Sequence, residues 1–222
     1  MNDRNARFPG AGSVPSVRRR LDGEGWTGIV LGAAMVALAL VAGLNFTFAA
    51  TVMPNLAGVD DRTFVEITQR FNANPTFPLS FTIGLVLIAL APLLQRRHSP
   101  GVALRWTVGA LVLYGVVLAI TFAISIPLNE QIDGAGDPDR IADLAHVRNE
   151  FEGLWVVSNI VRTLFAIASV AALARALFLH GRVTAARKAQ AGGGGSWAPP
   201  IRTFPEASSP PADLAREGMT VR

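Results

Sequence analysis

Apolar residues gather in four long blocks along the chain, and polar residues fill the segments between them. The blocks span residues 28–50, 77–94, 106–126 and 154–179. Because an α-helix rises about 1.5 Å per residue, about 20 apolar residues cross the hydrocarbon core of a bilayer. Blocks of this length without a polar face are typical of membrane spans and not of helices in a small water-soluble domain. The pattern therefore predicts four transmembrane helices.

The segments between the blocks predict how these helices connect. A short segment joins the second and third blocks, whereas the other two connections have 26 and 27 residues. Such a chain is expected to form an all-α membrane four-helix bundle of up-down-up-down topology over residues 26–182. The first block exceeds the about 7–15 apolar residues of a signal peptide, so we expect it to be retained. Residues 1–25 and the Gly-, Pro- and Ser-rich residues 183–222 are predicted to be disordered tails.

Basic residues are distributed unevenly between the two sides of the predicted spans. Nine lie on one side and four on the other, the nine being Arg18, Arg19, Arg20, Arg96, Arg97, Arg105, Arg182, Arg187 and Lys188. Because Lys and Arg favour the cytoplasmic side, both termini are predicted to be cytoplasmic, in a multi-pass protein of a bacterial plasma membrane. The net charge of +4 reflects this bias. No basic patch is interleaved with aromatic residues, so the predicted partner is the lipid bilayer and not a nucleic acid.

The two long connections carry helical patterns of their own. Residues 60–72 place four residues on one helix face: Phe64, Ile67, Thr68 and Phe71. With Thr63 and Glu66 as a capping box, they predict a short amphipathic helix on the bundle surface or in the membrane interface. In the second connection, Asp137 followed by a proline predicts a helix start, from which the fourth span would run inward as one long rod.

A polar stripe crosses the fourth block. Its members are Arg148, Glu152, Trp155, Asn159, Arg162 and Ser169. Steps of three, four and seven residues place these side chains on one helix face. With residue 154 at the membrane surface, Arg162 lies about 12 Å deep, close to the centre of a core whose half-thickness is about 15 Å. An arginine there costs about 2.5–3.5 kcal/mol, so we expect the stripe to face the interior of the bundle.

The other predicted helices bring polar groups to the same depth. These groups are Asn45 on the first helix, Asn72 just before the second, and Thr121, Ser125 and Asn129 on the third. Pro127 is predicted to break or end the third helix there. The convergence predicts a polar pocket in the outer half of the bundle, and the structural alternative is that the asparagines hold helices together. No acid lies inside a block, so Glu130 is the predicted partner of Arg162, directly or through water.

Several kinds of chemistry lack the residues that they need. The chain has no cysteine, which excludes disulfides and thiol chemistry. Its three histidines, His98, His146 and His180, lie outside the apolar blocks, and no Glu-x-x-His pair is present. The sequence therefore predicts no metal or haem site.

Four motifs, taken in order, resemble a known family. They are FTFAATVMPNL (46–56), FNANPTF (71–77), SIPLNEQI (125–132) and WVVSNIVRTLFA (155–166). In this order and spacing the chain resembles the anthrone-oxygenase-like membrane proteins over about residues 28–180. The resemblance implies an integral membrane protein of a family largely without an assigned reaction. For its fungal members it implies an oxygenase that needs no cofactor and turns an anthrone into an anthraquinone.

The residues suit the chemistry that this resemblance implies. A cofactor-free oxygenase forms an enolate that reacts with O₂, which requires a base, an oxyanion binder and a dry apolar pocket. Glu130 is the candidate base. Arg162 and Asn159 are candidates to hold the oxyanion, and Trp155 with Phe151 would stack a flat aromatic substrate.

The candidate substrate-binding set is completed by three asparagines, Asn129, Asn45 and Asn72. Two other classes of function compete with the oxygenase. One is a non-catalytic membrane scaffold or a lipid- or small-molecule-binding protein. The other is a small transporter, which ranks last because four spans would require a homodimer and no matching pair of broken helices is present.

Overall fold

The computed structural model describes residues 14–98 and 101–192. These residues form α-helices and two short π-helical segments, and no strand occurs among them. In chain order the elements are α1 Val14–Thr47, η1 Phe48–Val52, α2 Met53–Leu56, α3 Asp61–Asn72, α4 Thr76–His98, α5 Val102–Ile120, η2 Thr121–Ser125, α6 Ile126–Gly134 and α7 Leu144–Gly192. The all-α prediction is thus confirmed.

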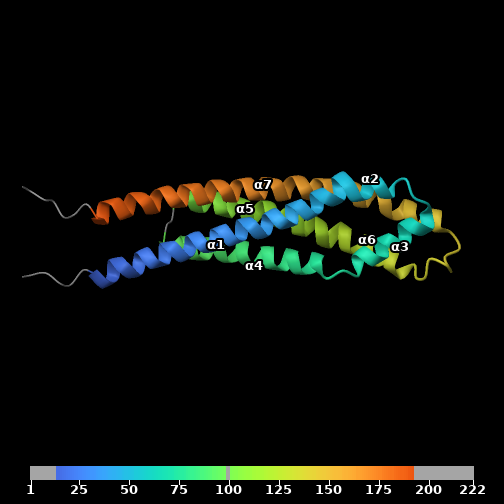
Figure 1. Cartoon of the computed structure of the whole chain (residues 1–222), viewed down its shortest axis with the longest axis horizontal. Coiled ribbons are helices and arrows are strands. Elements are labelled where there is room, and N and C mark those ends of the chain that lie inside the picture. Colours follow the sequence, from blue (N-terminus) through green and yellow to red (C-terminus); the bar gives the residue numbers. More distant parts are fainter. Residues whose placement is uncertain (1–13, 99–100, 193–222) are drawn as a thin grey trace, which may run out of the picture.

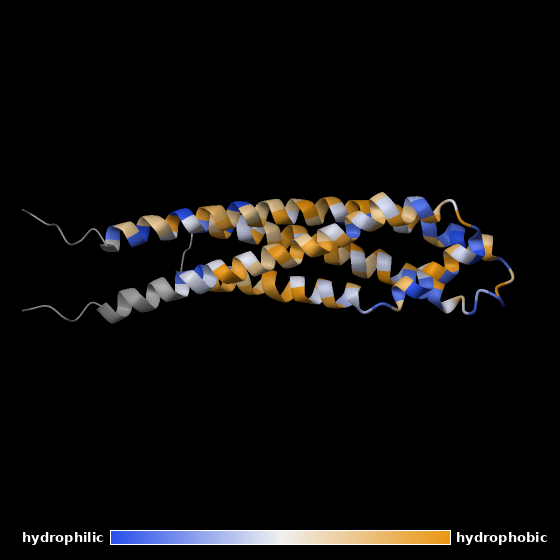
Figure 2. Cartoon of the chain, in the orientation of Figure 1, coloured by the Kyte–Doolittle hydropathy of each residue, from blue (hydrophilic) through white to orange (hydrophobic). Residues whose placement is uncertain are grey.

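Four helical rods are long and apolar enough to cross a membrane, as the four apolar blocks predicted. They cover Gly23–Leu56, Thr76–Arg97, Val102–Gly134 and Leu144–Gln190. Hydrophobic residues fill the middle of the rods and hydrophilic residues collect toward their ends (Figure 2). Length and composition together indicate an integral membrane protein.

The rods lie side by side, with the two ends of the described chain at the same end of the bundle (Figure 1). The opposite end carries α2, α3 and α6, and we call it the capped end. The long helices form a ring of neighbours, because α1 and α5 each pack against both α4 and α7. The main apolar core lies inside this ring and includes Leu38, Ile88, Tyr114 and Leu173.

Each π-helical segment ends two residues before a proline. In η1 the N–H of Met53 donates to Phe48 O, and in η2 the N–H of Ile126 donates to Thr121 O. Pro54 and Pro127 follow directly. A proline lacks an N–H and its ring clashes with the carbonyl four residues earlier, and widening the preceding turn removes that clash. The predicted break at Pro127 is therefore wrong, since the rod continues as a helix to Gly134.

The predicted amphipathic helix in the first connection is confirmed as α3. Phe64 is completely buried, and α3 packs against α6 and α7 across the capped end. The predicted capping residues differ, because Asp60 is the N-cap and accepts hydrogen bonds from Thr63 N and Oγ1. These bonds hold the pKa of Asp60 below its ordinary value, so the cap is lost only as the pH falls through that lowered pKa.

The last helix is one continuous rod that begins outside the apolar block, as predicted. Its start is at Leu144 and not at Asp137, because Asp143 accepts the hydrogen bond of the His146 N–H at the first turn. Helices α1 and α7 also extend past the predicted limits of the membrane domain, into residues 14–25 and 183–192. An ion pair between Glu24 and Arg187 joins these extensions. The remaining residues of both predicted tails, 1–13 and 193–222, lie outside the described residues.

Arg148 fastens α7 to the chain segment that enters the capped end. Its guanidinium donates to the carbonyl oxygens of Leu56, Ala57 and Val59 at 2.9–3.4 Å. The same group forms ion pairs with Asp61 at 3.0 Å and Glu152 at 2.7 Å. This first member of the polar stripe is therefore fully compensated by charge and by hydrogen bonds.

A close contact between α4 and α5 predicts a steric requirement at Gly84. The hydroxyl of buried Tyr114 donates to Phe81 O at 2.9 Å, and a Cβ at residue 84 would lie 2.8 Å from that hydroxyl. We expect Gly84→Ala to lower the free energy of unfolding by about 1–3 kcal/mol, as overpacking does. Adding Tyr114→Phe should recover most of this loss, because the hydroxyl is the closest atom. Thermal unfolding of both variants in detergent tests this, and a double variant no more stable than Gly84→Ala would contradict it.

Candidate functional site

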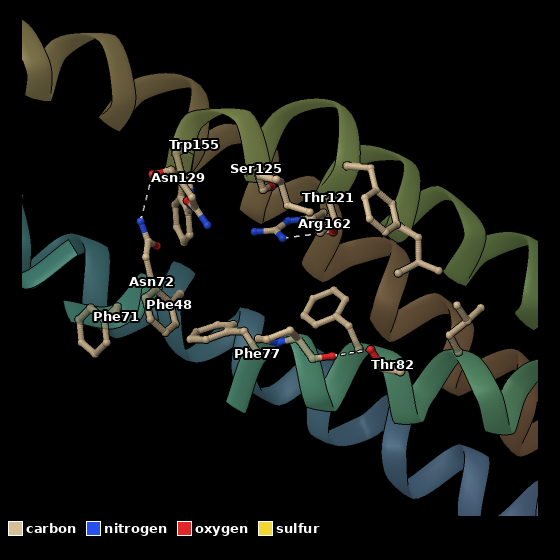
Figure 3. Close-up of a pocket in the computed structure, with 16 residues that line it drawn as sticks. Phe48, Phe71, Asn72, Phe77, Thr82, Thr121, Ser125, Asn129, Trp155 and Arg162 are labelled. Carbon is tan, nitrogen blue, oxygen red and sulfur yellow. Dashed lines mark hydrogen bonds between the residues drawn. The ribbon is translucent and has the colours of Figure 1, made fainter. Parts of the chain in front are cut away.

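A cavity of about 400 Å³ lies within the bundle near the capped end. One wall is α4, the other is the rod formed by α5, η2 and α6, and α7 contributes Trp155 and Arg162 between them. The lining residues are Phe48, Phe71, Asn72, Phe77, Pro78, Phe81, Thr82, Leu85, Leu118, Thr121, Phe122, Ser125, Ile126, Asn129, Trp155 and Arg162. Figure 3 shows Arg162 and Trp155 between the helix that carries Thr121 and the helix that carries Phe77.

Aromatic rings form one part of the lining. Phe48 meets Phe71 and Phe77 edge to face, with both pairs of ring centroids 5.2 Å apart. Its centroid also lies 5.8 Å from that of Trp155, which stacks on Phe151 behind it. Edge-to-face packing holds these rings in defined orientations, so the wall is a rigid surface suited to a flat apolar ligand.

Arg162 is the single charged side chain among the described residues that line the cavity. It is only 5% exposed. Its Nη1 donates to Thr121 Oγ1 at 3.3 Å, its Nη2 donates to Asn159 Oδ1 at 3.2 Å, and its Cζ lies 5.8 Å from the centroid of the Trp155 ring. Its Nε has no hydrogen-bond partner. The cation is therefore held by neutral groups alone and retains a free donor.

Other polar groups of the cavity come from four different elements, α3, η2, α6 and α7. Trp155 Nε1 donates to Asn129 Oδ1 at 2.9 Å. Asn72 Nδ2 donates to Asp133 Oδ1 at 3.0 Å and more weakly to Asn129 O at 3.4 Å, which ties α3 to α6. Ser125 is 2% exposed and its hydroxyl has no partner. A buried hydroxyl and a buried N–H without partners are rare in folded proteins, so both groups have unused hydrogen-bonding capacity next to the cavity.

The structure brings four of the predicted site residues to the cavity, namely Arg162, Asn129, Trp155 and Asn72. Asn159 and Asn45 lie behind this lining. The amide of Asn159 donates to the backbone oxygen of Asn45 at 3.0 Å and accepts from Arg162. Asn159 is therefore placed to orient the guanidinium, and Asn45 is buried with its own Nδ2 unpartnered.

Glu130 does not form the predicted direct ion pair with Arg162. It is exposed, it is absent from the cavity lining, and no ion pair among the described residues joins it to an arginine. The reason is that α6 continues as a helix past Pro127 with Asn129 facing the cavity. Successive side chains differ by about 100° around a helix, so Glu130 points away from the cavity. The catalytic role of Glu130 stays a prediction.

No acid and no histidine occurs among the described residues that line the cavity. Over residues 14–98 and 101–192, no group of three or more His, Asp or Glu side chains is arranged to hold a metal ion. The chemistry available at the cavity walls is therefore that of a guanidinium, hydroxyls, amides and aromatic rings.

The model of the family described as anthrone oxygenase matches residues 67–172, just under half of the chain. This part of the chain is anthrone-oxygenase-like. The matched region contains every residue of the cavity lining except Phe48, so the cavity is a feature of the region that resembles the family. No curated protein and no solved structure matches the chain.

The phenylalanines are the part of the site that the sequence did not predict. Phe48 and Phe77 stand inside the motifs that carry the anthrone-oxygenase resemblance, yet neither was singled out as a site residue. Phenylalanine is ordinary in a membrane helix, so residue type carries no signal here. A signal that could have pointed to Phe48 and Phe122 is the proline that follows each π-helical segment by two residues, since these two phenylalanines lie in the π-helical segments.

Proposed function

We propose that this protein binds a flat aromatic molecule bearing a ring oxygen in the cavity and acts on it as a cofactor-independent oxygenase. Both termini are cytoplasmic in this proposal, and the capped end faces the outer side of a bacterial plasma membrane. The observation that carries the proposal is Arg162, a buried cation beside an aromatic-lined cavity and without an acid partner.

The missing negative charge explains why a ligand oxygen is expected at this position. A buried cation is stabilised when an anion or a strong hydrogen-bond acceptor replaces the water that it has lost. Arg162 Nε and Ser125 Oγ are both unpartnered. A carbonyl, phenolate or enolate oxygen beside either group would accept its hydrogen, and it would do so most strongly as an anion.

The cavity suits a fused-ring ligand in size and surface. Its volume of about 400 Å³ falls in the about 300–1,000 Å³ range of small-molecule pockets. The rings of Phe48, Phe71, Phe77 and Trp155 offer edges and faces against which a planar molecule packs.

An anthrone-like substrate would react in two stages. It first loses a proton from the carbon opposite its carbonyl, which leaves an enolate whose oxygen is bound by Arg162. That carbon then forms a bond to O₂, and the resulting peroxide takes up a proton and loses water to leave a second carbonyl. One O₂ is consumed and one water is released, so no other oxidant is required. The apolar walls exclude water from the enolate.

The group that removes the first proton is tested by Glu130→Gln. A general base contributes about 10²–10⁴-fold to rate, so its loss would lower kcat by that factor at an unchanged Kd. Because Glu130 is exposed and does not line the cavity, we expect that it is not the base and that Glu130→Gln lowers kcat by less than about threefold. The substrate would then ionise by its own acidity, increased by Arg162. Initial rates of oxygen uptake measured with Glu130→Gln and with Glu130→Asp show whether Glu130 is the general base or the substrate ionises without a protein base.

The second candidate function is binding without turnover, as in a lipid- or small-molecule-binding protein. The absence of any acid or histidine from the described lining residues favours it. The deciding experiment is oxygen uptake by the purified protein in lipid vesicles supplied with a panel of anthrones, with Arg162→Met as the control. Uptake that is lost in the variant supports the oxygenase, whereas anthrone binding without uptake supports the binding protein.

A further inference from the structure

We infer that the ligand enters the cavity sideways from the lipid, through an opening between α4 and the rod of α5 and η2, and that it enters uncharged. This inference rests on the proposed function, in that the cavity must bind an aromatic molecule. It adds the route of entry and the class of ligand that can use that route.

The first support is that several residues both line the cavity and face the outside of the bundle. Phe122 of η2 is 65% exposed and Leu85 of α4 is 39% exposed, and both belong to the cavity lining. Pro78 and Thr82 on α4 are also exposed lining residues. A side chain can satisfy both conditions only at the rim of an opening, so these four residues mark the opening between the two rods.

The second support is that the rim is apolar. Of its residues only Thr82 has a polar side chain, and its hydroxyl donates to Pro78 O at 2.7 Å within α4. The rim therefore presents methyl, methylene and aromatic surface and offers no charge. A charged ligand would have to lose its solvation there without compensation, whereas a neutral one would not.

The third support is that the opening lies within the apolar belt. Leu79, Ile83 and Val86 beside it on α4 are each more than half exposed, and both walls lie inside the predicted membrane spans. Outside the membrane these residues would form an exposed apolar patch, so lipid is the surrounding that the belt requires.

The fourth support is that α3 closes the route from the capped end. Gln69 Nε2 donates to the backbone oxygens of Ile132 and Gly136, both at 2.9 Å. Asn72, which lines the cavity, bonds to Asp133 on the same rod. These bonds hold α3 against the end of α6 on the capped side of the cavity, whereas the exposed lining residues lie on the apolar side.

Together these features define the ligand class. The ligand must dissolve in lipid and be neutral at the rim, and it must carry an oxygen that becomes anionic or accepts strongly at Arg162. Weakly acidic fused-ring phenols and ketones meet both conditions. A permanently charged sulfonate of the same ring system does not.

The test uses a reversible bridge across the opening. Because the chain has no cysteine, a Thr82→Cys/Phe122→Cys protein can be joined by a bis-methanethiosulfonate linker without side reactions and released with dithiothreitol. The probe is 1,8-dihydroxyanthraquinone, which is stable to oxygen and fluorescent, added to protein in phosphatidylcholine vesicles. The linked protein should take up the probe about tenfold more slowly or worse, and cleavage of the linker should restore the rate.

A matched pair on the same two rods controls for the linker itself. Leu93 on α4 and Val108 on α5 are exposed and do not line the cavity. Linking Leu93→Cys to Val108→Cys should leave the rate of uptake unchanged. Protein linked at residues 82 and 122 after the probe has bound should release it about tenfold more slowly, whereas a linker that merely filled the cavity would expel it.

The outcomes separate this inference from the proposed function. If the linked protein takes up and releases the probe at the unlinked rate, while Arg162→Met weakens binding, the cavity is the binding site and the lateral route is wrong. If Arg162→Met binds the probe as well as the natural protein does, the proposed function is wrong, and the entry route, which depends on it, is wrong as well. A 2-sulfonated anthraquinone that binds as fast as the neutral probe would also overturn the route.

Discussion

Replacing Arg162 with methionine should weaken binding of 1,8-dihydroxyanthraquinone by about 10–10²-fold. Hydrogen bonds to a charged group contribute about 1.5–3 kcal/mol each, and the substitution removes the cation and its unpartnered Nε together. Fluorescence titration in lipid vesicles measures the Kd, with Arg162→Lys as the matched variant. Lysine keeps the charge but not the guanidinium, so an intermediate Kd is expected.

The same substitution should not destabilise the protein. Arginine at the centre of a span costs about 2.5–3.5 kcal/mol, and methionine fills the space without that cost. Thr121 keeps a hydrogen bond because its hydroxyl also donates to Val117 O, and only Asn159 Oδ1 loses its donor. If the net gain is about 1 kcal/mol, the Tm rises by about 2–4 °C. A fall in Tm, or unchanged binding, would make Arg162 a structural residue.

Replacing Arg148 with methionine should have the opposite effect on stability. Arg148 lies on the same face of α7, yet it contacts three backbone oxygens and two carboxylates, and its Cζ lies 4.5 Å from the centroid of the Phe64 ring. Breaking a buried charge network of this kind costs about 3–5 kcal/mol, which partial exposure to solvent reduces at this position. We therefore expect a loss of about 2–3 kcal/mol.

The loss should be localised at the capped end. Arg148 joins α7 to the turn between α2 and α3, so its removal frees α3 first. Hydrogen exchange followed by mass spectrometry should show faster exchange in residues 61–72 and little change in α5. Arg148→Lys is the control, and it should recover only part of the protection because lysine cannot reach all of these acceptors. Unchanged exchange in α3 would show that α3 is held in place without Arg148.

These two arginines show how far sequence alone could separate roles. Spacing along α7 placed Arg148 and Arg162 on one inward face, and both are on that face in the structure. Periodicity is a local property of the helix, so it can be counted from the sequence. Which of the two is neutralised depends on Asp61 and on carbonyl groups about 90 residues away in the chain, and no local pattern reports such contacts.

The third rod shows the same limit for two neighbouring residues, Asn129 and Glu130. Thr121, Ser125 and Asn129 were correctly placed together by their spacing, and all of them line the cavity. Glu130, just past Pro127, was expected to pair with Arg162 because it is the nearest acid by depth and no acid lies inside an apolar block. The π-helical turn instead accommodates the proline and the rod continues, which leaves Glu130 outside.

The amino-acid pattern predicts the four apolar rods, the amphipathic helix of the first connection and the inward face of α7, because each follows from the repeat of a helix. Three-dimensional packing sets which aromatic rings meet, where the cavity opens and which cation is left without an acid. Those features depend on helical phase after the two π-helical segments and on contacts between rods, and both are set by packing over the whole bundle.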